Sequence, residues 1–252
     1  MKTTHVLSRY ISALALLTAV AGPAVAQSTH VITFDEASQN LQHGSLFSGS
    51  EYSGLGGGVT FTVDSKGRHD QLIIFDTNQS GTADPDLENP FLGGNLKGVR
   101  NLGNALIIAE NLVDRNNNGL IDSPDDEAAG GRIGVIFGNS QVSAVGFSLY
   151  DTPETSKSDV TVVFKDMNGL SVTWKPSDLI ANGTNVDFAN HYGNHISNIS
   201  ASQLGLKNIQ SIDFNIESGA IDNLVFHTVP EPSSLALLGL GASAWLLRRK
   251  RF

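Results

Sequence analysis

The sequence predicts an all-β fold, a β-sandwich or jelly roll of about ten strands, on three observations. Between residues 27 and 229, no long stretch repeats its apolar residues with the 3.6-residue period of a helix. This region instead contains short alternating or apolar runs, separated by Gly, Asn, Asp and Ser, which favour turns. Nothing in it resembles a linker between two cores, so one domain is expected. The predicted strands are His30–Phe34, Val59–Val63, Gln71–Phe75, Ala105–Ala109, Arg132–Phe137, Val142–Leu149, Val160–Phe164, Ser171–Trp174, Ile209–Ile216 and Ala220–His227.

Three shorter segments carry local predictions. Met167-Asn168-Gly169 separates two predicted strands and is expected to form a hairpin turn. Ser200–Leu206 is expected to form one short helix that begins with a capping serine. His191 and His195 stand four residues apart, but the segment lacks the Glu of a zinc-protease helix and contains Gly193. A surface loop is therefore expected there.

Composition and charge exclude several classes of protein. The chain of 252 residues has no cysteine, which excludes disulfides, thiolate metal sites and cysteine nucleophiles. Its 16 basic and 25 acidic residues give a net charge of −9, which argues against nucleic-acid binding. When the six basic residues of the two terminal segments and Glu231 are set aside, residues 27–229 carry ten basic and 24 acidic residues, a net charge of −14. We expect a domain of this charge to attract cations.

The first 26 residues have the pattern of a secretory signal peptide. They begin with Lys2 and Arg9, continue with an apolar run, and end with the small residues Ala24 and Ala26 on either side of a valine. The apolar run is shorter than the roughly 20 residues that span a membrane, which disfavours the alternative of an N-terminal anchor. The chain is therefore predicted to be exported, with signal-peptidase cleavage after Ala26.

The C-terminal segment, residues 230–252, combines three features in a fixed order. Pro230, Glu231 and Pro232 come first, an apolar run rich in Leu, Ala and Gly follows, and a basic cluster ends the chain. The basic residues are Arg248, Arg249, Lys250 and Arg251. The prolines favour an extended backbone, the apolar run can lie in a bilayer, and the basic cluster holds its end on the cytoplasmic side.

This segment resembles the PEP-CTERM sorting signal of Gram-negative bacteria that make exopolysaccharide. The resemblance implies that a membrane-embedded exosortase recognises the segment and cleaves near the Pro-Glu-Pro tripeptide. It also implies an inner-membrane intermediate, followed by release to the cell surface or the extracellular matrix. The alternative is an ordinary C-terminal anchor that is never cleaved.

Two loops share the pattern D-x-N-x-[NS]-G-x-x-D, which resembles the beginning of an EF-hand-type calcium loop. The acid at position 12 makes the second loop similar to dockerin and thrombospondin-type loops. Oxygen ligands at alternate positions can surround a hard cation, and the glycine permits a sharp turn. The alternative is a solvated turn rich in Asn, Asp and Gly. The predicted calcium ligands are Asp76, Asn78, Ser80, Thr82, Asp84 and Asp86 in the first loop, and Asp114, Asn116, Asn118, Leu120, Asp122 and Asp125 in the second.

A third group of acids lies just after the first predicted strand and in the last one. Asp35 and Glu36 follow the first strand, and Asp222 lies in the last. In galactose-binding-like jelly rolls, which these positions resemble, the first and last strands pair and acids from both often bind a structural calcium. The resemblance implies a calcium site at these three residues. The alternative is that they are hydrogen-bonded residues at strand ends.

The combined expectation is a non-enzymatic, exported protein of the cell surface or exopolysaccharide matrix, with a calcium-stabilised sandwich that binds glycan or is structural. No nucleophile elbow, P-loop or dinucleotide fingerprint is present. The expected partners are the exosortase and an exopolysaccharide or other surface glycan, with membrane contact only through the C-terminal apolar run before processing. Two alternatives stay open, a secreted glycan-active hydrolase with a carboxylate pair and a protein-binding adhesin.

Overall fold

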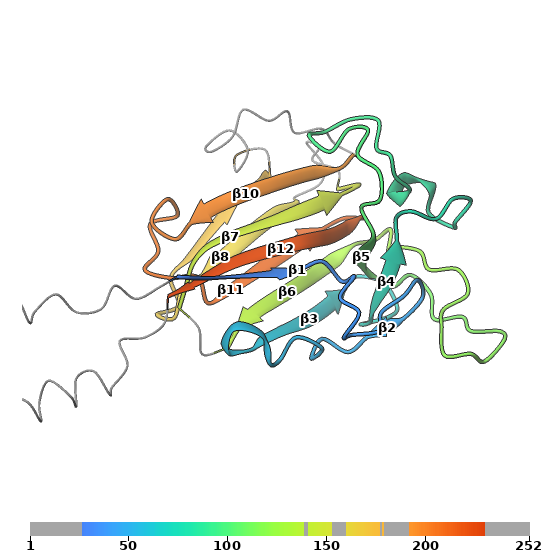
Figure 1. Ribbon diagram of the computed structural model, residues 1–252, viewed down its shortest axis with the longest axis horizontal. Coiled ribbons are helices and arrows are strands. Elements are labelled where there is room, and N and C mark those ends of the chain that lie inside the picture. The colour runs from blue at the N-terminus through green and yellow to red at the C-terminus, as the bar shows by residue number, and fades with distance from the viewer. Residues whose placement is uncertain (1–26, 139–140, 153–159, 177, 179–191, 230–252) are drawn as a thin grey trace, which may run out of the picture. The chain divides into compact units, whose positions relative to one another are not determined.

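The computed structural model describes residues 27–138, 141–152, 160–176, 178 and 192–229. In this part of the chain the fold is all-β, as predicted, with two antiparallel sheets and two short 3₁₀ turns (Figure 1). The strands are β1 (Ser28–Ile32), β2 (Leu46–Phe47), β3 (Val59–Ser65), β4 (Leu72–Asp76), β5 (Asn104–Ile108), β6 (Gly131–Phe137), β7 (Gln141–Tyr150), β8 (Thr161–Lys165), β9 (Ser171–Trp174), β10 (Asn194–Ser200), β11 (Ser211–Ile216) and β12 (Ala220–Val229). The 3₁₀ turns are η2 (Leu55–Gly57) and η3 (Pro85–Leu87).

The larger sheet brings the two ends of the domain together. Its strand order is β10-β7-β12-β5-β4-β2, and β1 also pairs with β12. β1 and β12 are antiparallel, with Ser28 opposite Thr228, so the predicted pairing of the first and last strands is confirmed. The smaller sheet has the order β3-β6-β11-β8-β9. β8 and β9 form the predicted hairpin, in which the Asp166 carboxylate accepts hydrogen bonds from the backbone N–H groups of Asn168 and Leu170.

The main hydrophobic core contains side chains from both sheets. Leu72 and Ile74 of β4 belong to it, together with Phe147 of β7 and Phe214 of β11, whose rings meet edge to face. Trp174 is partly buried against the same core. The two sheets therefore form a sandwich around a shared apolar layer.

A second apolar cluster covers the outer face of the larger sheet at β4 and β5. Ile73 and Phe75 alternate with the main-core residues of β4, and both are fully buried. Leu87 of η3 packs in this outer cluster. Buried residues on both faces explain why β4 and β5 are nearly continuous apolar runs. Two loops supply much of the cover: the β4–β5 loop (77–103) and the β5–β6 loop (109–130).

Two local predictions were wrong. The expected loop at His191–His195 runs into β10, which starts at Asn194 and pairs with β7. Its polar sequence and a bulge at Asn198, where φ is +57°, interrupt the alternation that identifies a strand. The expected helix at Ser200–Leu206 is instead the end of β10 followed by a turn. Ser200 does accept a hydrogen bond from the Gln203 N–H, but the turn buries Ala201, Leu204 and Leu206 in the main core.

The first strand is also displaced from its predicted position. β1 begins at Ser28 and ends at Ile32, whereas the sequence predicted His30–Phe34. Phe34 lies past the end of the strand with φ of +58° and is fully buried. The predicted signal peptide and sorting segment lie outside the described residues. Among the residues that are described, no helix is long and apolar enough to cross a membrane.

Candidate functional site

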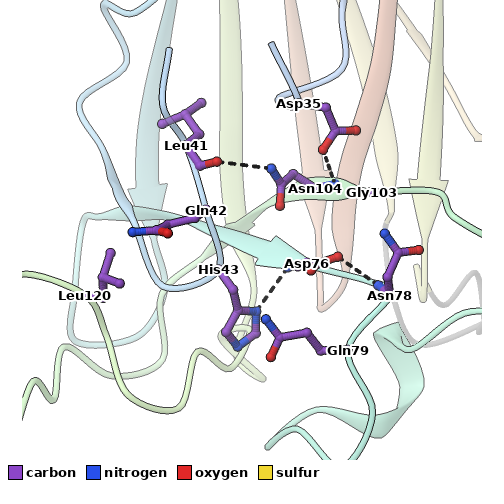
Figure 2. Close-up of a pocket in the computed structure, with 10 residues that line it drawn as sticks. All are labelled: Asp35, Leu41, Gln42, His43, Asp76, Asn78, Gln79, Gly103, Asn104 and Leu120. Carbon is purple, nitrogen blue, oxygen red and sulfur yellow. Dashed lines mark hydrogen bonds between the residues drawn. The ribbon is translucent and has the colours of Figure 1, made fainter. Parts of the chain in front are cut away.

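A polar pocket lies where β4 ends and β5 begins. Its volume is about 490 Å³, which is within the range of small-molecule sites. Acidic, amide and imidazole side chains dominate its lining, as Figure 2 shows. The lining residues are Asp35, Leu41, Gln42, His43, Asp76, Asn78, Gln79, Gly103, Asn104 and Leu120. Because the walls come from separate loops and two strands, the pocket exists only in the folded domain.

Asn104 at the start of β5 holds one wall of the pocket in place. Its side-chain amide donates to the Phe34 carbonyl at 3.0 Å, and its backbone N–H donates to Asp35 Oδ1 at 2.9 Å. Gly103 permits this close approach, because a Cβ there would lie 2.0 Å from Asp35 Oδ2, and its φ is +79°. Burial raises the pKa of Asp35, and the nearby charges of Glu36 and Asp76 raise it further, against the opposing backbone hydrogen bond.

His43 presents a fixed hydrogen-bond donor at the opposite wall. Its Nδ1 accepts the backbone N–H of Asp76 at 3.1 Å, so the proton of the neutral ring resides on Nε2. Burial lowers the pKa of His43, although the Asp76 charge opposes this effect. Asp76 in turn accepts the Asn78 N–H with Oδ1 at 2.9 Å. The pocket thus combines carboxylate acceptors with imidazole and amide donors, the groups that recognise hydroxyl-rich ligands.

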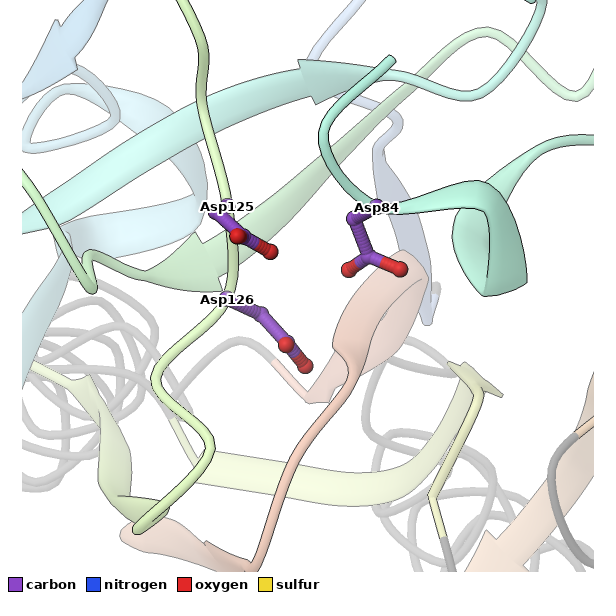
Figure 3. A group of neighbouring side chains, drawn as sticks. All are labelled: Asp84, Asp125 and Asp126. Carbon is purple, nitrogen blue, oxygen red and sulfur yellow. The ribbon is translucent and has the colours of Figure 1, made fainter. Parts of the chain in front are cut away.

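A second polar site is the acidic cluster of Asp84, Asp125 and Asp126. One carboxylate oxygen of each residue lies within 4.8 Å of the others (Figure 3). Asp84 belongs to the β4–β5 loop and immediately precedes η3, whose Leu87 is fully buried. Asp126 forms an antiparallel bridge with Ala109, which places the end of the β5–β6 loop beside β5. The cluster thus joins one predicted ligand from each loop, and Asp126 is a member that sequence reasoning missed.

The surroundings of the acidic cluster disfavour three ionised carboxylates in the absence of a cation. Asp84 and Asp126 are 7% and 8% exposed, and none of the three acids forms an ion pair with another described residue. Burial raises the pKa of Asp84, and Asp126 and Asp125 add to the effect. Burial also raises the pKa of Asp126, against a hydrogen bond from the Gly219 N–H. Asp151 contributes a further negative charge.

The first predicted calcium loop is divided between these two sites. Asp76 and Asn78 line the polar pocket, whereas Asp84 belongs to the acidic cluster. Thr82 donates its hydroxyl to Glu88 at 2.9 Å, and Ser80 and Asp86 are exposed. The loop is therefore held by its own hydrogen bonds in addition to any ligand it binds.

The second predicted loop is closed by side chain to backbone hydrogen bonds. Asp114 accepts from the N–H groups of Asn118 and Gly119, at 3.2 and 2.8 Å. Asp122 accepts from the Arg115 N–H at 2.8 Å and from the Asn116 side chain at 2.9 Å. The N–H of Leu120 bonds to the Asn118 side chain. Such bonds occur both in solvated Asx turns and in cation-binding loops, so calcium binding by the loop stays a prediction.

The third group of predicted ligands makes hydrogen bonds of its own. Glu36 accepts from the Tyr52 hydroxyl at 2.5 Å and from the Thr33 N–H at 2.7 Å. Asp222 is 1% exposed and accepts the Tyr150 hydroxyl at 2.7 Å. These bonds fit the alternative of hydrogen-bonded residues at strand ends, while calcium there stays a prediction. Of the three, Asp35 alone faces the pocket.

Sequence reasoning did not identify His43, Gln42, Gln79 or Asn104 as site residues. Gln79 occupies a variable position of the first predicted loop, and the other three belong to no recognisable motif. They meet through long-range contacts, such as the pairing of β4 with β5 and the hydrogen bond between His43 and Asp76. Asp126 did have a local signal, since it adjoins Asp125 in a run of acids.

Comparison with known proteins gives one match. No curated protein and no solved structure is significantly similar to the chain. Residues 228–251 match the model of the PEP-CTERM protein-sorting motif, which agrees with the resemblance of the C-terminal segment. This motif implies export to the cell surface in a Gram-negative bacterium and processing by an exosortase. The chain therefore carries a PEP-CTERM sorting motif at residues 228–251.

Proposed function

We propose that the exported domain is a non-enzymatic surface or matrix protein that binds an extracellular glycan in the polar pocket. The observation that carries this proposal is the set of hydrogen-bonding groups around the pocket (Figure 2). Asp35 Oδ1 and Asp76 Oδ1 are each engaged by a backbone N–H, which orients each carboxylate and leaves its second oxygen for a ligand. The Nε2–H of His43 supplies a donor. Gln42 and Gln79 add amides that can both donate and accept.

The charge of the pocket supports a neutral glycan as its ligand. Asp35 and Asp76 both face the pocket, and Lys and Arg are absent from its lining. An acidic sugar would place its carboxylate beside these acids without a compensating cation, at an electrostatic cost. A neutral sugar instead offers hydroxyl groups that donate to the carboxylates and accept from His43. The sorting motif supports the setting, because it brings the domain to the cell surface.

The test is a pull-down of the full chain, purified in mild detergent, on exopolysaccharide from the bacterium that produces this protein. Native protein is expected to bind, and Asp76→Asn and Gln79→Ala are expected to weaken binding at least fivefold. Asp64→Asn, which changes an exposed acid on β3, serves as the matched control and should bind as the native protein does. Absence of binding by the native protein, with and without calcium, would contradict the proposal.

The same pull-down also tests the alternative that the protein is a glycan hydrolase. Asp35 and Asp76 face one pocket, and the two acids influence each other electrostatically. A glycosidase would release reducing ends from the bound polysaccharide, and Asp76→Asn would abolish the release. The proposal expects no release by the native protein over the duration of the pull-down.

A further inference from the structure

The acidic cluster contains a buried oxygen that lacks a partner. Asp84 is 93% buried, and its Oδ2 forms no hydrogen bond within the described residues. Its Oδ1 accepts the Asp86 N–H at 3.2 Å. A buried carboxylate oxygen without a partner is strongly unfavourable unless a ligand satisfies it. The unpartnered oxygen belongs to a carboxylate that points toward Asp125 and Asp126 (Figure 3), so the missing partner is one that several carboxylates can share.

We propose that Asp84, Asp125 and Asp126 together bind one hard divalent cation, foremost calcium, that joins the β4–β5 loop to the β5–β6 loop. This site differs from the two loop sites expected from the sequence, because its ligands come from both loops. The donors are all carboxylate oxygens, without a His or Cys, which favours calcium over zinc. Oxygens bound to one calcium lie at most about 5 Å apart, so separations within 4.8 Å are compatible with a shared ion.

The surrounding structure holds the three ligands in a fixed arrangement. Leu87 buries η3 in the outer core and thereby fixes Asp84 at its N-terminal end. The Glu127 N–H donates to the Ile108 carbonyl at 2.9 Å, and the Glu110 N–H donates to the Asp125 carbonyl at 3.1 Å. These bonds fix Asp125 and Asp126 beside the end of β5. The site is therefore preorganised by strand β5 on one side and by the outer core on the other.

A cation at this position would perform the task that disulfides perform in other exported domains. The chain has no cysteine, yet both loops are long and cover the outer face of the larger sheet. An ion that binds only when both loops are in place stabilises the folded state by mass action. Its two positive charges would also offset part of the charge of three adjacent carboxylates.

The test compares calcium binding and thermal unfolding of the full chain in mild detergent. Native protein is expected to bind calcium by isothermal titration and to melt at a higher temperature in calcium than in chelator. Asp84→Asn and Asp125→Asn should each weaken calcium binding at least tenfold. Asp86→Asn is the matched control, since Asp86 is exposed, lies two residues from Asp84 and belongs to the loop site expected from the sequence.

A second comparison separates lost binding from damaged folding. Asp84→Asn removes a buried charge that has no partner, so in chelator the variant should melt at or above the temperature of the native protein. In calcium the order should reverse, because only the native protein gains stability. Equal melting temperatures of native protein in calcium and chelator, or native affinity in Asp84→Asn, would overturn the proposal. Loss of binding in Asp86→Asn but not in Asp125→Asn would assign the ion to the first loop alone and also overturn the proposal.

Discussion

Two buried aspartates illustrate how single residues are accommodated in this domain. Asp222 accepts hydrogen bonds from the Tyr150 hydroxyl and from the side chain and N–H of Asn223. Burial nevertheless raises its pKa well above the usual value. Asp84 is buried to a similar degree, but one of its oxygens has no partner among the described residues. The difference makes Asp84 the stronger candidate ligand, while calcium binding at Asp222 stays a prediction.

His195 makes the stability of the domain depend on pH. It is partly buried, its Nδ1 lies 3.0 Å from the Ser148 hydroxyl, and burial lowers its pKa. Below about pH 6.5 the unfolded chain therefore binds a proton that the folded state resists, so the contribution of His195 to stability falls as the pH decreases. The raised pKa values of Asp84 and Asp126 act in the opposite direction, so the effect is measured as a difference between two proteins. In urea unfolding, a change from pH 7.5 to 5.5 should be less favourable to native protein than to His195→Asn. An equal change in the two proteins would contradict the assignment to His195.

At the scale of single elements, the β4–β5 loop covers the edge of the larger sheet. β10 is the last strand on that side, and an exposed edge strand offers unpaired backbone groups to other chains. Asn95 pairs with His195 as another strand would, since its Nδ2 donates to the His195 carbonyl and its Oδ1 accepts the His195 N–H, both at 2.6 Å. One side chain thus anchors the loop and protects the edge.

Asn95→Ala should leave both backbone groups of His195 without their partner. We expect a loss of about 1–2 kcal/mol in the free energy of unfolding, the usual cost of broken side-chain hydrogen bonds. Amide hydrogen exchange at His195 should become faster, while exchange in β11, in the other sheet, should change little. Unchanged exchange at His195 would show that the loop does not protect this edge.

At the scale of the whole molecule, the excess of negative charge is concentrated in the exported part. Residues 27–229 carry a net charge of −14 once the basic terminal segments and Glu231 are set aside. Self-repulsion of this size destabilises a compact state and is screened by salt. In chelator, raising sodium chloride from about 0.05 to 0.5 M should therefore raise the melting temperature, as differential scanning fluorimetry can measure. A smaller rise is expected in calcium, and a decrease in chelator would contradict this account.

The sequence was informative where a signal is local and uninformative where contacts are distant. β4 and β5 were predicted correctly because both of their faces are buried and their sequences are nearly continuous apolar runs. β10 was missed because its polar residues and bulge disrupt the alternation. Asp84 and Asp125 were recognised as candidate ligands, but their meeting depends on how two loops pack over the outer core. No spacing along the chain encodes that packing.

The position of β12 has a mechanical consequence for a protein that is sorted to the cell surface. β12 ends at Val229, directly before Pro230, and its hydrogen bonds run to β7 along one edge and to β1 and β5 along the other. A pull on the C-terminal end of the domain, directed along this strand, loads these bonds in shear. Bonds loaded in shear must break together, whereas bonds that are peeled break one after another. Tension from the C-terminal side therefore enters the domain through a strand that is hydrogen-bonded along both edges.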